Sequence, residues 1–144
     1  MFNERLKILR ENNDFKQKDI ADFLQCKRST YANWENETII IPLDIADRLT
    51  LFYKVSLSYI LAQSSKDYID YPVVKMNYKY LLKKLKELKE INNHSYEKIA
   101  EYIATSKSTA YKYFVGNLKI PSDKLILLSE LYNIDLDVLC GKKD

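Results

Sequence analysis

The stretch Gln17–Asn36, QKDIADFLQCKRSTYANWEN, contains two short amphipathic segments joined by a tight turn. The second segment places Tyr31 and Trp34 on one face. The first has an apolar stripe at helical spacing, formed by Ile20, Ala21, Phe23 and Leu24. The pattern predicts two helices that cross closely, because Ala21 is small at the point where the second helix must pass.

The opposite face of the second segment carries only small, polar or basic side chains, which are Lys27, Arg28, Ser29, Ala32 and Asn33. Two helices with a short turn and such a face are the pattern of a helix-turn-helix, whose second helix can enter the major groove of DNA. Many buried helical hairpins look similar, so one copy of the pattern is modest evidence. This chain contains it twice.

The repeat appears when the sequence is aligned with itself. Residues 5–61 then match residues 84–140 without a gap, and apolar positions keep their phase throughout. Ile20-Ala21 recurs 79 residues later as Ile99-Ala100. The same offset of 79 residues relates the two Ile-Pro pairs that end at Pro42 and Pro121. We infer a tandem duplication.

An all-α fold is expected, because the chain has only two glycines and three prolines and few stretches alternate as strands do. Each copy is expected to form five helices. Residues 1–62 are predicted to be the first domain, residues 63–77 a linker that contains Pro72, and residues 78–144 a second, divergent domain. In the second domain the first three helices are expected at 78–91, 96–104 and 107–115.

Composition narrows the possible functions. The net charge is +3, and residues 1–62 carry nine basic and nine acidic side chains, so local placement of Lys and Arg would have to attract a nucleic acid. The sequence has no apolar run of membrane-spanning length and no basic-then-apolar leader, so a soluble cytoplasmic protein is expected.

Catalysis and metal binding are not expected. One histidine and two distant cysteines, Cys26 and Cys140, are too few for the usual zinc ligand set, and both thiols are expected to be buried. The sequence has no Gly-rich phosphate loop and no clustered nucleophile and base. We therefore expect no enzyme activity, no cofactor, no metal and no small-molecule substrate.

With both copies laid out, each resembles the Cro/C1-type (XRE-family-like) helix-turn-helix of phage repressors and related bacterial regulators. The resemblance covers residues 2–62 and, more loosely, residues 80–141. It is carried by Gln17, Ile20-Ala21, Ser29-Thr30, Trp34-Glu35, Pro42 and Val55-Ser56-Leu57. It implies two tandem five-helix lambda-repressor-like domains. It also implies a repressor-like transcription regulator that binds double-stranded DNA sequence-specifically, and it allows a homodimer.

The resemblance also implies roles for individual residues. Base contacts would come from Arg28, Ser29 and Asn33 in the third helix, with Lys27 able to reach a base or a phosphate. Arg can donate two hydrogen bonds to guanine, and Asn can pair with adenine. Arg10 and Glu35 would form a structural ion pair between the first and third helices. The expected phosphate contacts are Lys16, Gln17 and Asn36.

Each domain departs from the family pattern. In the first, lysines replace the usual Ser or Thr caps, and Glu37 stands where the family has glycine. In the second, Lys89, Tyr96 and Phe114 replace Arg10, Gln17 and Glu35. The ion pair is thereby lost, and Lys89 is expected to face solvent. The weaker DNA contacts expected there are Ser95, Tyr96, Lys107, Ser108, Tyr111 and Lys112.

Two readings of function remain open. In the first, the tandem chain replaces a dimer and reads two half-sites about 34 Å apart, and its differing faces predict an asymmetric target. In the second, one or both domains have become protein-interaction or dimerisation modules that no longer bind DNA. The neutral first domain and the eroded second motif favour this alternative.

Overall fold

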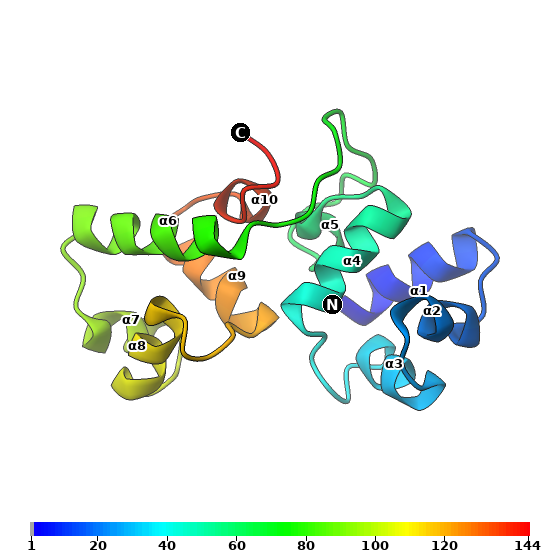
Figure 1. The fold of residues 1–144 in the computed structure, drawn as a ribbon, viewed down its shortest axis with the longest axis horizontal. Helices are drawn as coiled ribbons and strands as arrows, with labels where there is room; N and C mark the ends of the chain where they lie inside the picture. The colour runs from blue at the N-terminus through cyan, green and yellow to red at the C-terminus, as the bar shows by residue number, and fades with distance from the viewer. Residues whose placement is uncertain (1) are drawn as a thin grey trace. The chain divides into compact units, whose positions relative to one another are not determined.

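A computed structural model describes residues 2–144, with side chains from Glu4 onward, and it divides into two compact units, Met1–Lys75 and Met76–Asp144. All regular structure in the described residues is helical, which confirms the prediction of an all-α chain (Figure 1). Phe2, expected on the apolar face of the first helix, has its side chain outside the described residues.

The first unit contains α1 (Phe2–Asn12), α2 (Gln17–Leu24), α3 (Arg28–Glu35), α4 (Leu43–Tyr53) and α5 (Leu57–Ile60). Helix α2 packs on α3, and α1 packs on both α3 and α5. The centre of this core is fully buried Leu6, Ile20, Tyr31 and Leu49. Helix α2 ends at Leu24, and the next residue, Gln25, adopts the left-handed conformation with φ 58° and turns the chain toward α3.

The second unit contains α6 (Tyr78–Ile91), α7 (Tyr96–Tyr102), α8 (Lys107–Val115), α9 (Ser122–Leu131) and α10 (Leu136–Leu139). Helix α7 packs on α8, and α6 packs on α8 and α10 (Figure 1). Side-chain oxygens of Ser95 and Ser106 accept hydrogen bonds from the first turns of α7 and α8. The two units therefore place an equivalent helix pair, α2–α3 and α7–α8, on similar cores.

The backbone carbonyl groups at the end of α2 and at the end of α7 accept hydrogen bonds from different side chains in the two units. In the first unit, Arg48 of α4 donates to the carbonyls of Phe23 and Leu24 at 3.2 and 3.3 Å. In the second, Lys124 of α9 donates to the carbonyl of Ile103 at 2.7 Å. A cation at a helix C-terminus also interacts favourably with the negative end of the helix dipole. Both contacts therefore stabilise the turn before α3 and the turn before α8.

Several sequence expectations about burial and helix ends are wrong. Phe23, part of the expected apolar stripe, is 40% exposed, and Tyr102, which occupies the matching apolar position of the second copy and was expected in the core, is 46% exposed. The Phe23 ring lies at the edge of the core, 4.4 Å from the ring of Phe52. Cys26 is partly exposed rather than buried. Helix α7 ends at Tyr102, before the predicted end, because Ala104 adopts a left-handed conformation with φ 56°.

Gly116 ends α8 with φ 86°, a conformation in which a side chain is strained, and an added Cβ would lie 3.1 Å from Leu82 Cδ1. We expect Gly116→Ala to lower the free energy of unfolding by about 1–2 kcal/mol. Thermal unfolding followed by circular dichroism measures this loss. The exposed neighbour Asn117→Ala is the control, and an unchanged melting temperature for Gly116→Ala would contradict the expectation.

In the part of the chain that the structure describes, no helix is both long and apolar enough to cross a bilayer. Residues 61–77 contain no helix. The start of this segment is tied to the first unit, because Arg5 donates a 2.7 Å hydrogen bond to the carbonyl of Ser64.

Candidate nucleic-acid interface

The exposed face of α3 presents the residues that sequence analysis assigned to base contacts. Lys27, Arg28 and Ser29 are exposed at its start, and Asn33 is partly exposed one turn later. Residues 29 and 33 are four apart, so they share one face of the helix. The structure therefore brings basic, hydroxyl and amide groups together on one ridge, with no large apolar side chain between them.

The guanidinium of Arg28 is oriented by a neighbour on α2. Its Nη1 donates a 2.9 Å hydrogen bond to Oε1 of Gln17. The Gln17 amide in turn donates to Oε1 of Glu35 over 3.5 Å, at the outer limit for a hydrogen bond. These contacts link the start of α2 to both ends of α3. They leave the other nitrogen atoms of Arg28 available for an acceptor outside the protein.

Arg10 and Glu35 form an ion pair beneath this ridge. Arg10 Nε donates to Glu35 Oε2 at 2.9 Å and Nη2 to Oε1 at 2.7 Å, so the contact is bidentate. The side chains are 13% and 6% exposed. The remaining guanidinium nitrogen, Nη1, donates to the carbonyl of Phe15 at 3.0 Å, before α2. One side chain of α1 thus fixes both α3 and the start of α2.

The ion pair also determines the charge state of Glu35. Burial alone would raise the pKa of this carboxyl, but the hydrogen bonds and charge of Arg10 outweigh it and hold the pKa below its usual value. Hydrogen bonding to Glu35 raises the pKa of Arg10, against the opposing effect of burial. Both groups are therefore charged at neutral pH.

The three candidate phosphate contacts flank the ridge. Lys16 is exposed, Gln17 is partly exposed, and Asn36 is exposed just after α3. Asn36 Oδ1 accepts hydrogen bonds from the backbone and the hydroxyl of Thr38, at 2.9 and 2.6 Å. The amide oxygen is thereby occupied, so a phosphate would have to be bound by the NH2 group of Asn36.

Sequence reasoning missed two supporting residues. The Lys16 side chain cannot accept a hydrogen bond and so cannot cap α2. Asp19 compensates, because its Oδ2 accepts a 2.7 Å hydrogen bond from the backbone N–H of Lys16. Asp19 is the third residue after Lys16, a spacing known from capping boxes, so the sequence did contain this signal. Arg48 gave no such signal, because its contact with α2 bridges 24 residues of sequence.

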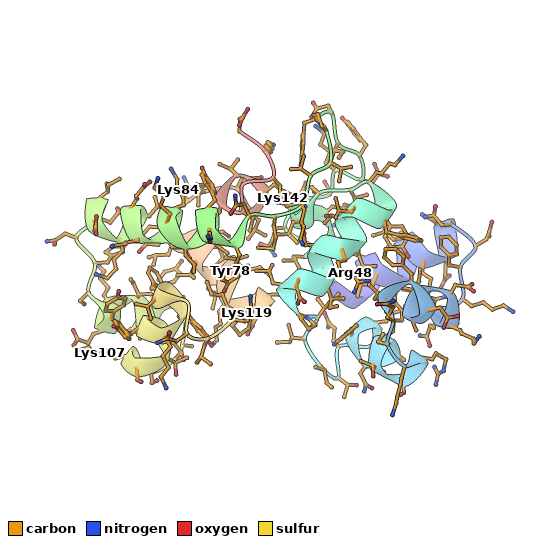
Figure 2. All side chains as sticks on the ribbon, in the orientation of Figure 1. Arg48, Tyr78, Lys84, Lys107, Lys119 and Lys142 are labelled. Carbon is orange, nitrogen blue, oxygen red and sulfur yellow. The ribbon has the colours of Figure 1, made fainter. Side chains whose placement is uncertain are left out.

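The matching face of the second unit has a different chemistry. Lys107 Nζ lies 2.6 Å from Glu97 Oε1, and this contact lowers the pKa of the Glu97 carboxyl. The charge of Lys107, which is labelled in Figure 2, is therefore matched by Glu97 at the start of α8. Ser95 is used as the cap of α7. Ser108, Tyr111 and Lys112 are exposed.

Aromatic packing replaces the ion pair in the second unit. The Tyr96 ring makes edge contacts with the rings of Phe114 and Tyr111, at centroid distances of 5.8 and 5.3 Å. Lys89, expected to face solvent, instead lies 4.4 Å from the centre of the Tyr96 ring. The expectation was wrong because the tyrosine that replaces Gln17 offers a cation a π-face.

Among the described residues, no three His, Cys, Asp or Glu side chains lie close enough together to hold a metal ion. The single histidine, His94, is partly buried, with Nδ1 3.1 Å from the hydroxyl of Tyr132. Burial and two nearby lysines, Lys98 and Lys89, lower the pKa of its imidazole.

Comparison with known proteins identifies a helix-turn-helix domain in the first unit. Residues 3–66 match the family model described as a helix-turn-helix domain. The chain is also 33% identical over 61 residues to the uncharacterized HTH-type transcriptional regulator YobD of Bacillus subtilis (strain 168). That match covers 42% of this chain and 54% of the relative, so the chain spans about half the length of the curated relative it matches. No solved structure gives a significant match.

Proposed function

Since the first unit is an XRE-like helix-turn-helix domain, we propose that the chain is a transcription regulator of repressor type that binds double-stranded DNA sequence-specifically through α3. Arg28, Ser29 and Asn33 contact base edges in the major groove, and Lys27 reaches either a base or a phosphate. Lys16, Gln17 and Asn36 bind the flanking phosphates.

One observation carries this proposal. The polar ridge of α3 is exposed, whereas the residues that hold it in place are buried beneath it in the Arg10–Glu35 ion pair. An ordinary solvated helix face needs no such support. A ridge that must enter a groove in a fixed orientation does need it, because hydrogen bonds to base edges have strict geometry.

The chemistry of the ridge suits duplex DNA. Arg28 can donate two hydrogen bonds to guanine O6 and N7, and Asn33 can both donate to and accept from adenine. Lys16 and Lys27 add positive charge where each helix of the pair begins. These local charges supply the attraction to phosphate that the neutral first unit lacks as a whole.

The proposal is tested by selecting duplexes from a random pool with the intact chain and then measuring affinity across salt concentrations. Binding should yield a consensus sequence and should weaken by roughly tenfold or more between 50 and 200 mM salt, because several phosphate contacts release counterions. The duplex with a scrambled consensus is the control. No enrichment, or an affinity independent of salt, would contradict the proposal.

A second candidate function applies to the second unit alone. The position of Asn36 is taken by Val115, and the position of Ala32 by Tyr111, and both replacements are exposed. Glu97 also places a carboxylate beside the start of α8. These features favour a protein-interaction module over a second DNA-reading face.

A further inference from the structure

Helix α6 of the second unit carries a row of exposed lysines. Lys79, Lys83 and Lys86 are four and three residues apart, so they share one face of the helix. All three are exposed, whereas Leu81 and Leu85 form the buried side of α6. We call Lys79, Lys83 and Lys86 the α6 lysine row. It lies on a different helix from the face of α8 that matches the α3 ridge.

Positive charge is concentrated on α6. The helix contains five lysines and two glutamates, and this excess of three equals the net charge of +3 of the whole chain. In the part of the chain that the structure describes, the three lysines of the row make no ion pair. Glu90 follows Lys86 by four residues on the same face and ends the row. The positive part of the face therefore extends from residue 79 to residue 86.

A further cation lies beside the start of α6. The ammonium of Lys119, in the loop after α8, is 4.4 Å from the centre of the Tyr78 ring, and both residues are labelled in Figure 2. Tyr78 is the first residue of α6 and precedes Lys79. The loop thus adds positive charge at the end of the row that is farther from Glu90.

The repeat shows that the fold does not require this charge. The offset of 79 residues aligns Lys83 with Glu4 and Lys86 with Lys7 of α1. Lys7 Nζ lies 3.8 Å from Glu11 Oε1, so the matching face of the first unit carries a paired lysine among glutamates. Both units form the same helix with opposite charge at this place. Packing therefore does not explain the lysines of α6.

We propose that the α6 lysine row binds the phosphate backbone of duplex DNA beside the bases that α3 reads, an inference that rests on the proposed function of the first unit. At a rise of 1.5 Å per residue, residues 79–86 span about 10 Å, over which one DNA strand presents about three phosphates. Lysine is a flexible point charge with donors only, which suits phosphate and carries no information about base sequence.

An acidic protein is a poorer occupant of the row. Protein interfaces usually have an apolar or aromatic anchor at their centre, and each position of the row is a lysine. A weak contact with phosphate is sufficient here, because α3 already holds the chain on the duplex. The predicted linker of residues 63–77 can extend to about 50 Å, so the second unit stays within reach of the same duplex.

The salt dependence of duplex binding tests the proposal with the full chain and the triple variant Lys79→Ala, Lys83→Ala, Lys86→Ala. At 100 mM salt the variant should bind the selected duplex roughly tenfold or more weakly. The slope of log affinity against log salt should become shallower by about 2–3, because each lost phosphate contact removes about 0.9. Base preference should stay unchanged. Alanine favours helix at these exposed positions, and circular dichroism checks that the variant is folded.

The repeat supplies a matched control. Lys86→Ala should make the slope shallower by about 1, whereas Lys7→Ala, at the equivalent position of α1, should leave the slope nearly unchanged. Glu90→Gln should strengthen binding about two- to threefold, because it removes a carboxylate that repels phosphate at the end of the row.

A triple variant with the affinity and the slope of the parent overturns the proposal, and so does a parent that binds no duplex. Poly-glutamate distinguishes the other occupant: a triple variant that loses only its binding to poly-glutamate identifies an acidic protein and also overturns the proposal. If selection yields no consensus, α3 does not read bases as proposed. The slopes of parent and variant on an arbitrary duplex then still test the row, because phosphate contacts do not depend on sequence.

Discussion

Replacing Arg28 with alanine should lower the affinity of the chain for its selected duplex by about 1–3 kcal/mol, or roughly five- to 150-fold, and should relax base preference at one position. Asn33→Ala should have an effect of similar size at a different base pair. Under the proposed function, both losses arise from hydrogen bonds to base edges. They should therefore depend on the sequence of the duplex, and competition between the consensus and single-base variants measures that dependence.

The structure separates this effect from a loss of folding. Arg28 is exposed and donates a 2.9 Å hydrogen bond to Gln17, so its removal should change the unfolding free energy by less than about 1 kcal/mol. Chemical unfolding of each variant checks this. An affinity loss with unchanged stability assigns the effect to the DNA contact.

Lys7→Ala is the matched control for charge. Lys7 lies on α1 with its side chain 62% exposed, and it pairs only loosely with Glu11 at 3.8 Å. Its removal takes away one positive charge without touching α3. It should lower affinity slightly and equally for every duplex. If Arg28→Ala behaves in the same way as Lys7→Ala, then Arg28 acts as a general charge and does not read a base.

Much of the fold could be predicted because its signals are local. The bounds of α6 and α8 agree with the expected ranges 78–91 and 107–115, because each helix follows its own apolar periodicity and begins after a capping side chain, Asn77 or Ser106. The wrong expectations depend on tertiary context. Phe23 and Tyr102 follow the apolar period of their helices, but nothing in the local sequence says that these positions lie at the edge of the core.

In the candidate site, too, local features could be predicted from the sequence and contacts between distant residues could not. Periodicity alone places Lys27, Arg28 and Ser29 on the outer face of α3, because the inner face is defined by Tyr31 and Trp34. The pairing of Lys107 with Glu97 could not be read from the sequence, since it joins two helices across a turn. The same applies to Lys89, whose environment depends on the ring that replaced Gln17.

Breaking the Arg10–Glu35 pair should have the largest effect on stability. Glu35→Ala leaves a guanidinium with little exposure and no carboxylate, and should lower the unfolding free energy of the first unit by about 3–5 kcal/mol. Trp34 provides a specific readout, because it is the only tryptophan of the chain, is buried, and precedes Glu35 on α3. Its fluorescence during urea unfolding therefore reports on the unit that has lost the pair.

The double variant Arg10→Met, Glu35→Leu distinguishes a broken pair from lost packing. It leaves no unpaired charge, so it should recover most of the stability that Glu35→Ala loses. Lys89→Ala, at the matching position of the second unit, should change the Trp34 transition by no more than about 1 kcal/mol, because it removes only a cation–π contact. Equal losses for the single and double variants would contradict the assignment.

The same pair predicts how the first unit responds to acid. Because the pKa of Glu35 is lower in the folded chain than its usual value, the ionised carboxylate favours folding. This contribution is fully present above the ordinary glutamate pKa of about 4.3 and is lost as the pH falls through the lower folded value. Urea unfolding of the parent should therefore show a steep loss of stability below about pH 4, and the double variant should show a shallower one, because it has no carboxylate at this position to protonate.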